Sequence, residues 1–209
     1  MGFCERLRNE TKENHSKVDN HRFVELIKTD KFAMKLYLFF NMICFEYLDS
    51  YKNSTPPELL KKIVRPNKTA IITENQYKNP NNFLFSWWTT KQSNFSDKFY
   101  FIWKDTNMNE LLKHIMLNSI ENSYLFTFGL LYGGNIISKY MDNIFDKETA
   151  EHHKMYLKFE NSNQLKNEFK EYLETISKEN EEKFIETVNK SYSLIEKIFD
   201  RFVEEIKSN

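Results

Sequence analysis

Apolar side chains recur at helical spacing along most of this chain. Residues 178–207 give the clearest case, with seven positions on one stripe: Phe184, Val188, Tyr192, Ile195, Phe199, Phe202 and Ile206. Spacings of three and four residues bring such positions to one face of an α-helix. The same pattern predicts helices over residues 3–28, 31–52, 121–145 and 163–175. The sequence therefore predicts an all-α helical bundle.

The remaining segments have weaker patterns. Every proline lies within residues 53–82, which predicts short helices and loops there. Residues 83–103 are rich in aromatic side chains, and helix and strand periods fit them equally well, so we expect loop and short helix. Residues 107–114 can begin a helix, and the polar residues 146–162 are predicted to be looped in part. No repeat or linker is evident, which predicts one domain over residues 1–209.

Composition limits the kinds of binding partner and the cellular setting that we expect for this protein. Lys and Arg together number 30, as do Asp and Glu, so net charge gives no argument for binding nucleic acid or an acidic membrane. The two cysteines, Cys4 and Cys44, make no disulfide framework, which predicts a reducing, cytoplasmic setting. The most apolar run, 32–48, is interrupted by Lys35, Asn41 and Glu46, so we expect no membrane span.

Three of the four glycines, Gly129, Gly133 and Gly134, lie within six residues of a helical stretch. Glycine inside a helix costs about 0.5–1 kcal/mol relative to alanine, so the cluster needs a compensating cause. Gly129 and Gly133 share a face at i,i+4, and without Cβ atoms they would let a flat ligand lie against the backbone. Tight helix–helix packing through small residues explains the cluster equally well.

His15 is the first candidate for chemistry. It lies one turn after Thr11 and one turn before Asp19, and a carboxylate at i+4 can accept one ring N–H and make the other nitrogen a better metal ligand. Arg8 and Lys12 would place cationic groups beside the imidazole. An exposed histidine on a charged helix is the commoner explanation for such a pattern.

The other histidines give weaker signals. His21 and His114 have no partner at ligand spacing, and the His152–His153 pair lies in a polar segment expected on the solvated surface. No HExxH, CxxC or paired ExxH motif supports a zinc or di-iron site, and no glycine-rich phosphate loop is present. These absences leave His15 and the glycine cluster as the candidates to explain.

Together, the segments around His15 and the glycines resemble the haem oxygenase family. LRNETKENHSKVDNHRF, residues 7–23, is similar to that family's proximal helix, with His15 at the position of the axial iron ligand. YLFTFGLLYGGN, residues 124–135, is similar to its distal helix, whose glycines lie over the haem face. The stripe over residues 192–204 is similar to its last helix.

The resemblance implies a haem-oxygenase-like bundle that holds haem between a proximal and a distal helix. It implies oxidative cleavage of haem, as both substrate and cofactor, to biliverdin, carbon monoxide and iron, with electrons from a ferredoxin or flavoprotein reductase. The glycines Gly129, Gly133 and Gly134 would line the distal face. Further haem contacts, mostly at the propionates, are implied at Arg8, Lys12, Tyr124, Lys166, Lys170 and Phe199.

The distal helix departs from the family pattern. Leu130 stands where the family has an aspartate that holds a water network near the iron. Phe126 stands in place of the usual arginine, and Ile195 in place of a pocket asparagine. The distal wall is therefore predicted to be apolar, and leucine cannot hold water for proton delivery.

Three interpretations stay open at this point. The first is a working haem oxygenase whose distal water is held by another route, for which Tyr132, Asn122 and Asn135 are candidates. The second is a carrier, sensor or pseudoenzyme that binds haem with little or no ring opening. The third is a helical protein of this fold that binds no haem.

Overall fold

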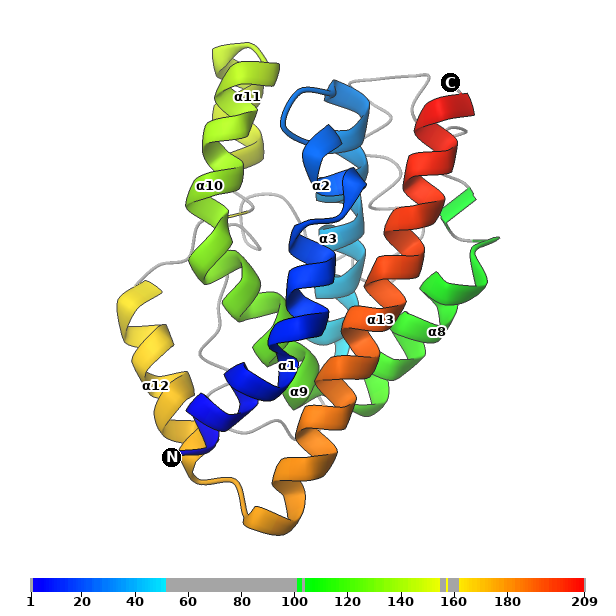
Figure 1. The fold of residues 1–209 in the computed structure, drawn as a ribbon. Coiled ribbons are helices and arrows are strands. Elements are labelled where there is room, and N and C mark those ends of the chain that lie inside the picture. Colours follow the sequence, from blue (N-terminus) through cyan, green and yellow to red (C-terminus); the bar gives the residue numbers. More distant parts are fainter. Residues whose placement is uncertain (1, 52–100, 103, 155–156, 158–161, 209) are drawn as a thin grey trace.

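The computed structural model describes residues 2–51, 101–102, 104–154, 157 and 162–208 (Figure 1). These residues form helices and contain no strand, which confirms the all-α prediction. The expectations for residues 53–82 and for nearly all of residues 83–103 lie outside the described residues. No helix in the described ranges is long and apolar enough to cross a membrane.

The helices follow one another along the chain as labelled in Figure 1. They are α1 (Phe3–Asp19), α2 (Arg22–Leu26), α3 (Lys31–Tyr51), α8 (Thr106–Leu117), α9 (Ser119–Ser123), the π-helix η1 (Tyr124–Phe128), α10 (Gly129–Ile144), α11 (Lys147–Lys154), α12 (Ser162–Glu174) and α13 (Lys178–Ser208). The predictions over residues 31–52, 163–175 and 178–207 correspond to α3, α12 and α13.

The helix predicted over residues 3–28 is in fact two helices. α1 ends at Asp19, and α2 begins at Arg22 after an extended residue, His21, whose φ is −65° and ψ is 144°. The backbone N–H of Phe23 donates to His21 Nδ1 at 3.1 Å, so the imidazole caps α2. Hydrophobic periodicity continues across this break, which is why the sequence pattern does not show it.

The helix predicted over residues 121–145 is divided into α9, η1 and α10. In the π-helix η1 each backbone hydrogen bond joins residues five apart, instead of four apart as in an α-helix. The turn just before Gly129 therefore contains one extra residue. Turns of this kind occur mostly as single insertions in α-helices and often at functional sites. The glycine helix therefore begins directly after a local irregularity.

Residues 147–154 of the segment predicted to be looped in part form α11. Asp146 caps it by accepting from the backbone N–H of Thr149 at 2.9 Å. His153 is buried, and its ring centroid lies 4.9 Å from that of Phe145. The expectation of a solvated His152–His153 pair is therefore wrong for His153, because α11 turns this residue toward the core.

The long helix α13 is the centre of the packing. It lies against α1, α2, α3, α8 and α9, and its predicted apolar stripe is buried for most of its length. Phe199 and Phe202 pack with Phe23 of α2, at centroid distances of 4.7 and 5.1 Å, and with Phe40 of α3. Aromatic contacts of this kind hold α2 and α3 against one face of α13.

Two sets of polar contacts fix α1, the helix that carries His15. At its start, the backbone N–H groups of Phe3 and Cys4 donate to the Glu174 carboxylate of α12 at 3.0 and 2.9 Å, which satisfies two amides that the helix leaves unpaired. One turn later, Arg6 bridges to α13 through Glu181, at 2.8 Å, and Glu182. α1 is thus tied to both α12 and α13.

Candidate functional site

His15 lies in the last turns of α1 with its side chain about half exposed. Its Nε2 is 3.2 Å from Oδ2 of Asp19, so the carboxylate lies beside the ring as the spacing predicts. The ring also contacts Tyr192 of α13, with centroids 5.4 Å apart and planes tilted by 44°. With one ring nitrogen beside the carboxylate, the other is left to bind a metal ion.

Two tyrosines that the sequence analysis did not connect with His15 lie near the Asp19 carboxylate. Burial raises the pKa of the Tyr192 phenol, and the neighbouring Tyr124 and Asp19 raise it further. Burial also raises the pKa of Tyr37 of α3, to about 12; the Asn41 side chain opposes this rise, and Asp19 adds to it. Both hydroxyls therefore stay protonated at neutral pH and are neutral hydrogen-bond donors.

A second group of side chains gathers near the start of α1. Burial raises the pKa of Tyr124 in η1 to about 12, with Cys4 adding to the rise and Arg8 opposing it. Burial likewise raises the pKa of Cys4, while the positive charges of Lys170 and Arg8 oppose that rise. Arg8 of α1, Lys170 of α12 and Tyr124 of η1 thus lie around Cys4.

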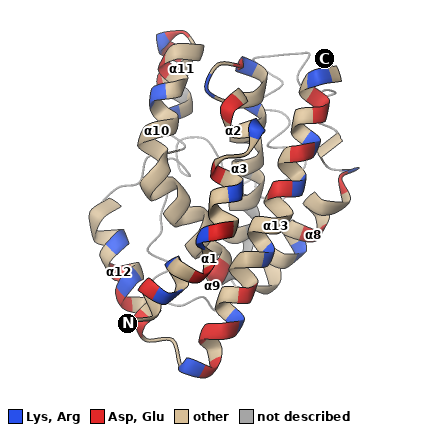
Figure 2. Ribbon diagram, in the orientation of Figure 1, with Lys and Arg blue, Asp and Glu red and all other residues tan. Residues whose placement is uncertain are grey.

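Lys166, one turn before Lys170 on α12, reaches α10. Its Nζ lies 4.4 Å from the ring centroid of Tyr132, which is itself an electrostatic neighbour of Tyr124. We call Arg8, Lys166 and Lys170 the cationic cluster. Figure 2 shows basic residues on α12 close to the start of α1. The predicted residues Arg8, Tyr124, Lys166 and Lys170 therefore come together from three helices.

Arg8, the member of the cationic cluster that lies on α1, precedes His15 on the same helix. Arg8 and His15 are seven residues apart, which is about two helical turns and about 10.5 Å at 1.5 Å per residue. Lys12 lies between them on the same helix and is exposed. His15 and Arg8 therefore share one side of α1, about two turns apart.

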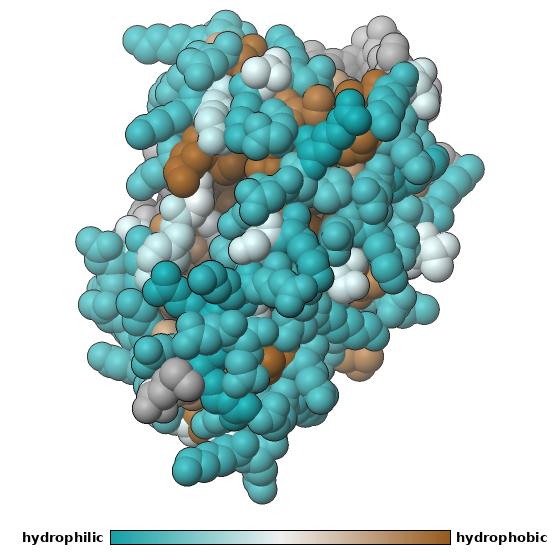
Figure 3. Space-filling view, in the orientation of Figure 1, coloured by the Kyte–Doolittle hydropathy of each residue, from teal (hydrophilic) through white to brown (hydrophobic). Residues whose placement is uncertain are grey.

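The glycines differ in what surrounds them. An added Cβ at Gly129 or Gly133 would meet no heavy atom of the described residues within 4 Å, whereas one at Gly134 would lie 3.2 Å from the carbonyl oxygen of Leu157. Among the described residues, close packing therefore accounts for Gly134, through the Leu157 backbone, and not for Gly129 or Gly133. Figure 3 shows apolar atoms at the surface in the part of the view where α10 lies, and Tyr132 and Ile136 of α10 are each about half exposed.

This difference predicts that alanine has different effects on stability at neighbouring glycines. Gly129→Ala and Gly133→Ala should each stabilise the ligand-free protein by about 0.5–1 kcal/mol, since alanine favours the helix and its Cβ meets no atom in the part of the chain that the structure describes. Gly134→Ala should gain less or lose stability, because its Cβ approaches the Leu157 carbonyl. Chemical denaturation of the three variants measures this; equal gains at all three sites would contradict it.

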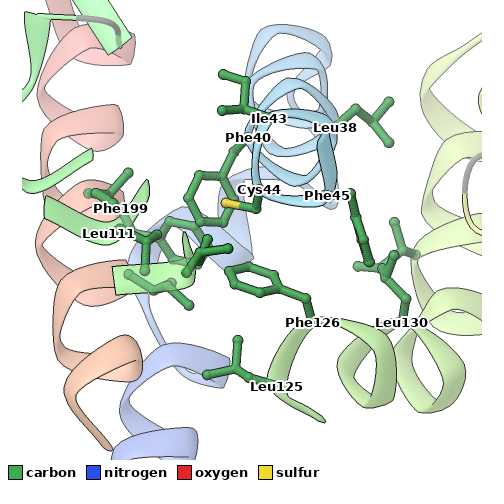
Figure 4. Close-up of a cluster of buried hydrophobic side chains, with 14 of the residues drawn as sticks. Leu38, Phe40, Ile43, Cys44, Phe45, Leu111, Leu125, Phe126, Leu130 and Phe199 are labelled. Carbon is green, nitrogen blue, oxygen red and sulfur yellow. The ribbon is translucent and has the colours of Figure 1, made fainter. Parts of the chain in front are cut away.

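Phe126 and Leu130 are buried rather than open. The Phe126 ring lies 6.2 Å from that of Phe40 and 6.1 Å from that of Phe45, both of α3. Figure 4 shows Leu130 beside Phe45 and Phe126 pointing into the same apolar cluster. The wall predicted to be apolar thus consists of buried apolar side chains that point toward α3, whereas an added Cβ at Gly129 or Gly133 would meet no atom of the described residues.

Tyr132, Asn122 and Asn135, the candidates for holding distal water in place of an aspartate, do not lie where they could do so. Asn122 is fully buried; its amide donates to the carbonyls of Asn118, at 2.8 Å, and His114, and its oxygen accepts from Ser191 at 2.7 Å. His114 Nε2 lies 3.1 Å from the Thr187 carbonyl. Asn122 therefore belongs to a satisfied network between α8, α9 and α13. Tyr132 and Asn135 are exposed.

Two other predicted residues lie in the core. Ile195 is buried on α13, and Phe199 is 3% exposed within its cluster of Phe23, Phe40 and Phe202. Phe199 is therefore not gathered with the cationic cluster. Within the described ranges, no group of three or more His, Cys, Asp or Glu residues could hold a metal ion.

Comparison with known proteins identifies the fold. No family model matches the sequence, and no match is found among curated proteins. Four solved chains match in structure, among them haem oxygenase-1 from the cyanobacterium Synechocystis, determined in complex with haem. The match has a TM-score of 0.60 and 18% sequence identity, and it covers 100% of this chain and 96% of that chain. This chain therefore has the all-α fold of a haem oxygenase.

Proposed function

We propose that this protein binds haem through His15 and cleaves it oxidatively to biliverdin, carbon monoxide and iron. The observation that carries the proposal is the backbone at Gly129 and Gly133, where an added Cβ would meet no atom of the described residues, in a chain whose fold is that of a haem oxygenase. A flat macrocycle needs backbone without side chains on one face, and these two glycines give it such a surface.

The chain's other groups fit the chemical parts of haem. Haem is an apolar disc with an iron at its centre and two carboxylates at one edge. His15 would bind the iron, with Asp19 fixing the ring. The cationic cluster, whose Arg8 lies about two turns from His15 along α1, would receive the carboxylates, and the protonated Tyr124 hydroxyl would donate to them.

Bound haem would supply the iron that activates oxygen and would itself be the molecule oxidised. The chain's part is to orient the ring and to control water. Phe126 and Leu130 are buried beside α3 and exclude water from their part of the wall. Electrons would come from a ferredoxin or a flavoprotein reductase. Protons would have to reach the oxidised edge by a route other than Leu130 or Asn122.

The apolar wall favours a second candidate function, haem binding with little or no ring opening. A carrier or sensor needs only the imidazole, the glycine surface and the cationic cluster. Efficient ring opening also needs a polar group that moves protons. Leu130 and Phe126 offer none, and the Asn122 amide is already engaged.

One experiment tests both functions. Haem is added to the purified protein, followed by ascorbate or a reductase system in air, and the visible spectrum is recorded over time. We expect a Soret band that forms and then decays into the broad red absorption of biliverdin. A Soret band that forms and persists would establish the second candidate instead. If no Soret band forms at stoichiometric haem, both functions are wrong.

A further inference from the structure

Tyr132 joins α10 to the cationic cluster through its ring face. The ammonium of Lys166 lies 4.4 Å from the ring centroid, within the range of a cation–π contact. Tyr132 is 52% exposed, so its ring covers little of the core. Exposing half of a large aromatic ring to water costs more free energy than exposing a small polar side chain. Tyr132 therefore needs an explanation other than packing in the core.

The Tyr132 ring is held in place by its own helix. Tyr124, Phe128 and Tyr132 follow one another at four-residue spacing, with ring centroids 5.2 and 5.7 Å apart. Phe128 packs in turn on Phe169 of α12 at 5.0 Å, edge to face. The stack therefore runs from η1 into α10 along α12, and it presents the Tyr132 ring to Lys166 as a fixed surface.

A lysine over such a surface differs from a free one. An exposed lysine has a flexible four-carbon stem, and holding it in one place for a ligand costs conformational entropy. Contact with a fixed ring orders the ammonium before the ligand arrives. The ammonium has three N–H donors, and the ring face occupies one side of it, which leaves donors for a carboxylate.

We propose that Tyr132 is a positioning residue that holds Lys166 ready for a carboxylate at the edge of the bound porphyrin. Tyr132 thereby favours tetrapyrroles with free carboxylates over those with neutral edges. The inference rests on the proposed haem binding and adds a determinant of specificity to it. Tyr132 acts through Lys166, so removing the ring should matter only when the ligand has a carboxylate for the lysine to bind.

Binding constants for haem and for its dimethyl ester test this role, because the ester keeps the iron and the ring but has no free carboxylates. We expect Tyr132→Leu to weaken haem binding about three- to fivefold, as expected for loss of an exposed cation–π contact, and to leave ester binding unchanged. Tyr132→Phe is the matched control, since it keeps the ring face, and should bind haem as the wild type does.

Lys166→Met completes the set. If Tyr132 acts through this lysine, the double variant Tyr132→Leu with Lys166→Met should bind haem no more weakly than Lys166→Met alone. Equal weakening of haem and ester by Tyr132→Leu would overturn the inference, because Tyr132 would then contact the macrocycle itself. Additive losses in the double variant would also overturn it. A wild type that binds neither ligand would overturn the proposed function and this inference with it.

Discussion

His15→Ala should lower the affinity for haem by about a hundredfold or more and remove the spectrum of histidine-ligated iron. The imidazole is the proposed bond to the metal, and the cationic cluster and glycine surface alone would hold haem weakly. Titration with haem, followed at the Soret band, measures both effects. The fold should survive the change, since His15 is about half exposed and alanine is the best helix former.

A second histidine gives the matched control for this variant. His21 Nε2 lies 3.2 Å from Oδ1 of Asp200, the same distance as between His15 and Asp19, but His21 caps α2 beside Phe199. His21→Ala should therefore keep the haem spectrum. Added imidazole should partly restore the spectrum of His15→Ala by occupying the vacated position. An unchanged haem affinity in His15→Ala would remove this residue as the ligand.

Leu130→Asp should raise the rate of ring opening at least about tenfold if proton delivery is the missing element. General acid–base groups typically contribute about 10²–10⁴-fold to a rate, and only part of that is expected from a group placed without its full surroundings. The same change should destabilise the ligand-free protein by about 2–4 kcal/mol, because the carboxylate replaces a buried side chain beside Phe45. Single-turnover decay of the Soret band and denaturation measure the two effects.

Two further substitutions at Leu130 distinguish the effect of an added polar group from the effect of an added cavity. Leu130→Ala opens a cavity without adding a polar group, so its ring-opening rate should stay near that of the wild type. Leu130→Asn adds polarity without a titratable proton, and its rate should lie between those of the wild type and Leu130→Asp. If Leu130→Ala raised the ring-opening rate as much as Leu130→Asp does, the cavity and not the carboxylate would be the cause. An unchanged rate in Leu130→Asp would show that the apolar wall does not limit turnover.

Much of the architecture follows from hydrophobic period alone. The stripe on α13 is long and unbroken, and it is buried as the spacing predicts. α3 and α12 are likewise predicted because no turn interrupts their apolar patterns; α12 has one buried face, whereas the described side chains of α3 from Ala33 to Leu48 are nearly all buried. The pairing of His15 with Asp19 is equally predictable, since residues four apart on a helix are neighbours whatever the tertiary structure.

The features that the sequence pattern did not predict depend on single residues or on contacts between distant parts of the chain. The break at His21 and the π-turn of η1 each change the backbone without changing the apolar pattern around them. The contact of His15 with Tyr192 joins residues 177 positions apart, and no periodic signal reports such a meeting. The different surroundings of Gly133 and Gly134 depend on Leu157, which belongs to a later segment.

α12 combines two tasks in one short helix. Lys166, Lys170 and Glu174 follow at four-residue spacing and so share one side of it. Glu174 holds the first amides of α1, while the two lysines supply most of the positive charge proposed to meet the ligand's acidic edge. A helix of about three to four turns tilts as one unit. A tilt that breaks the hydrogen bonds from Glu174 to the α1 amides would therefore also move both lysine ammonium groups. α12 therefore both fixes the start of α1, which carries the proposed iron ligand His15, and carries the two lysines proposed to bind the ligand's carboxylates.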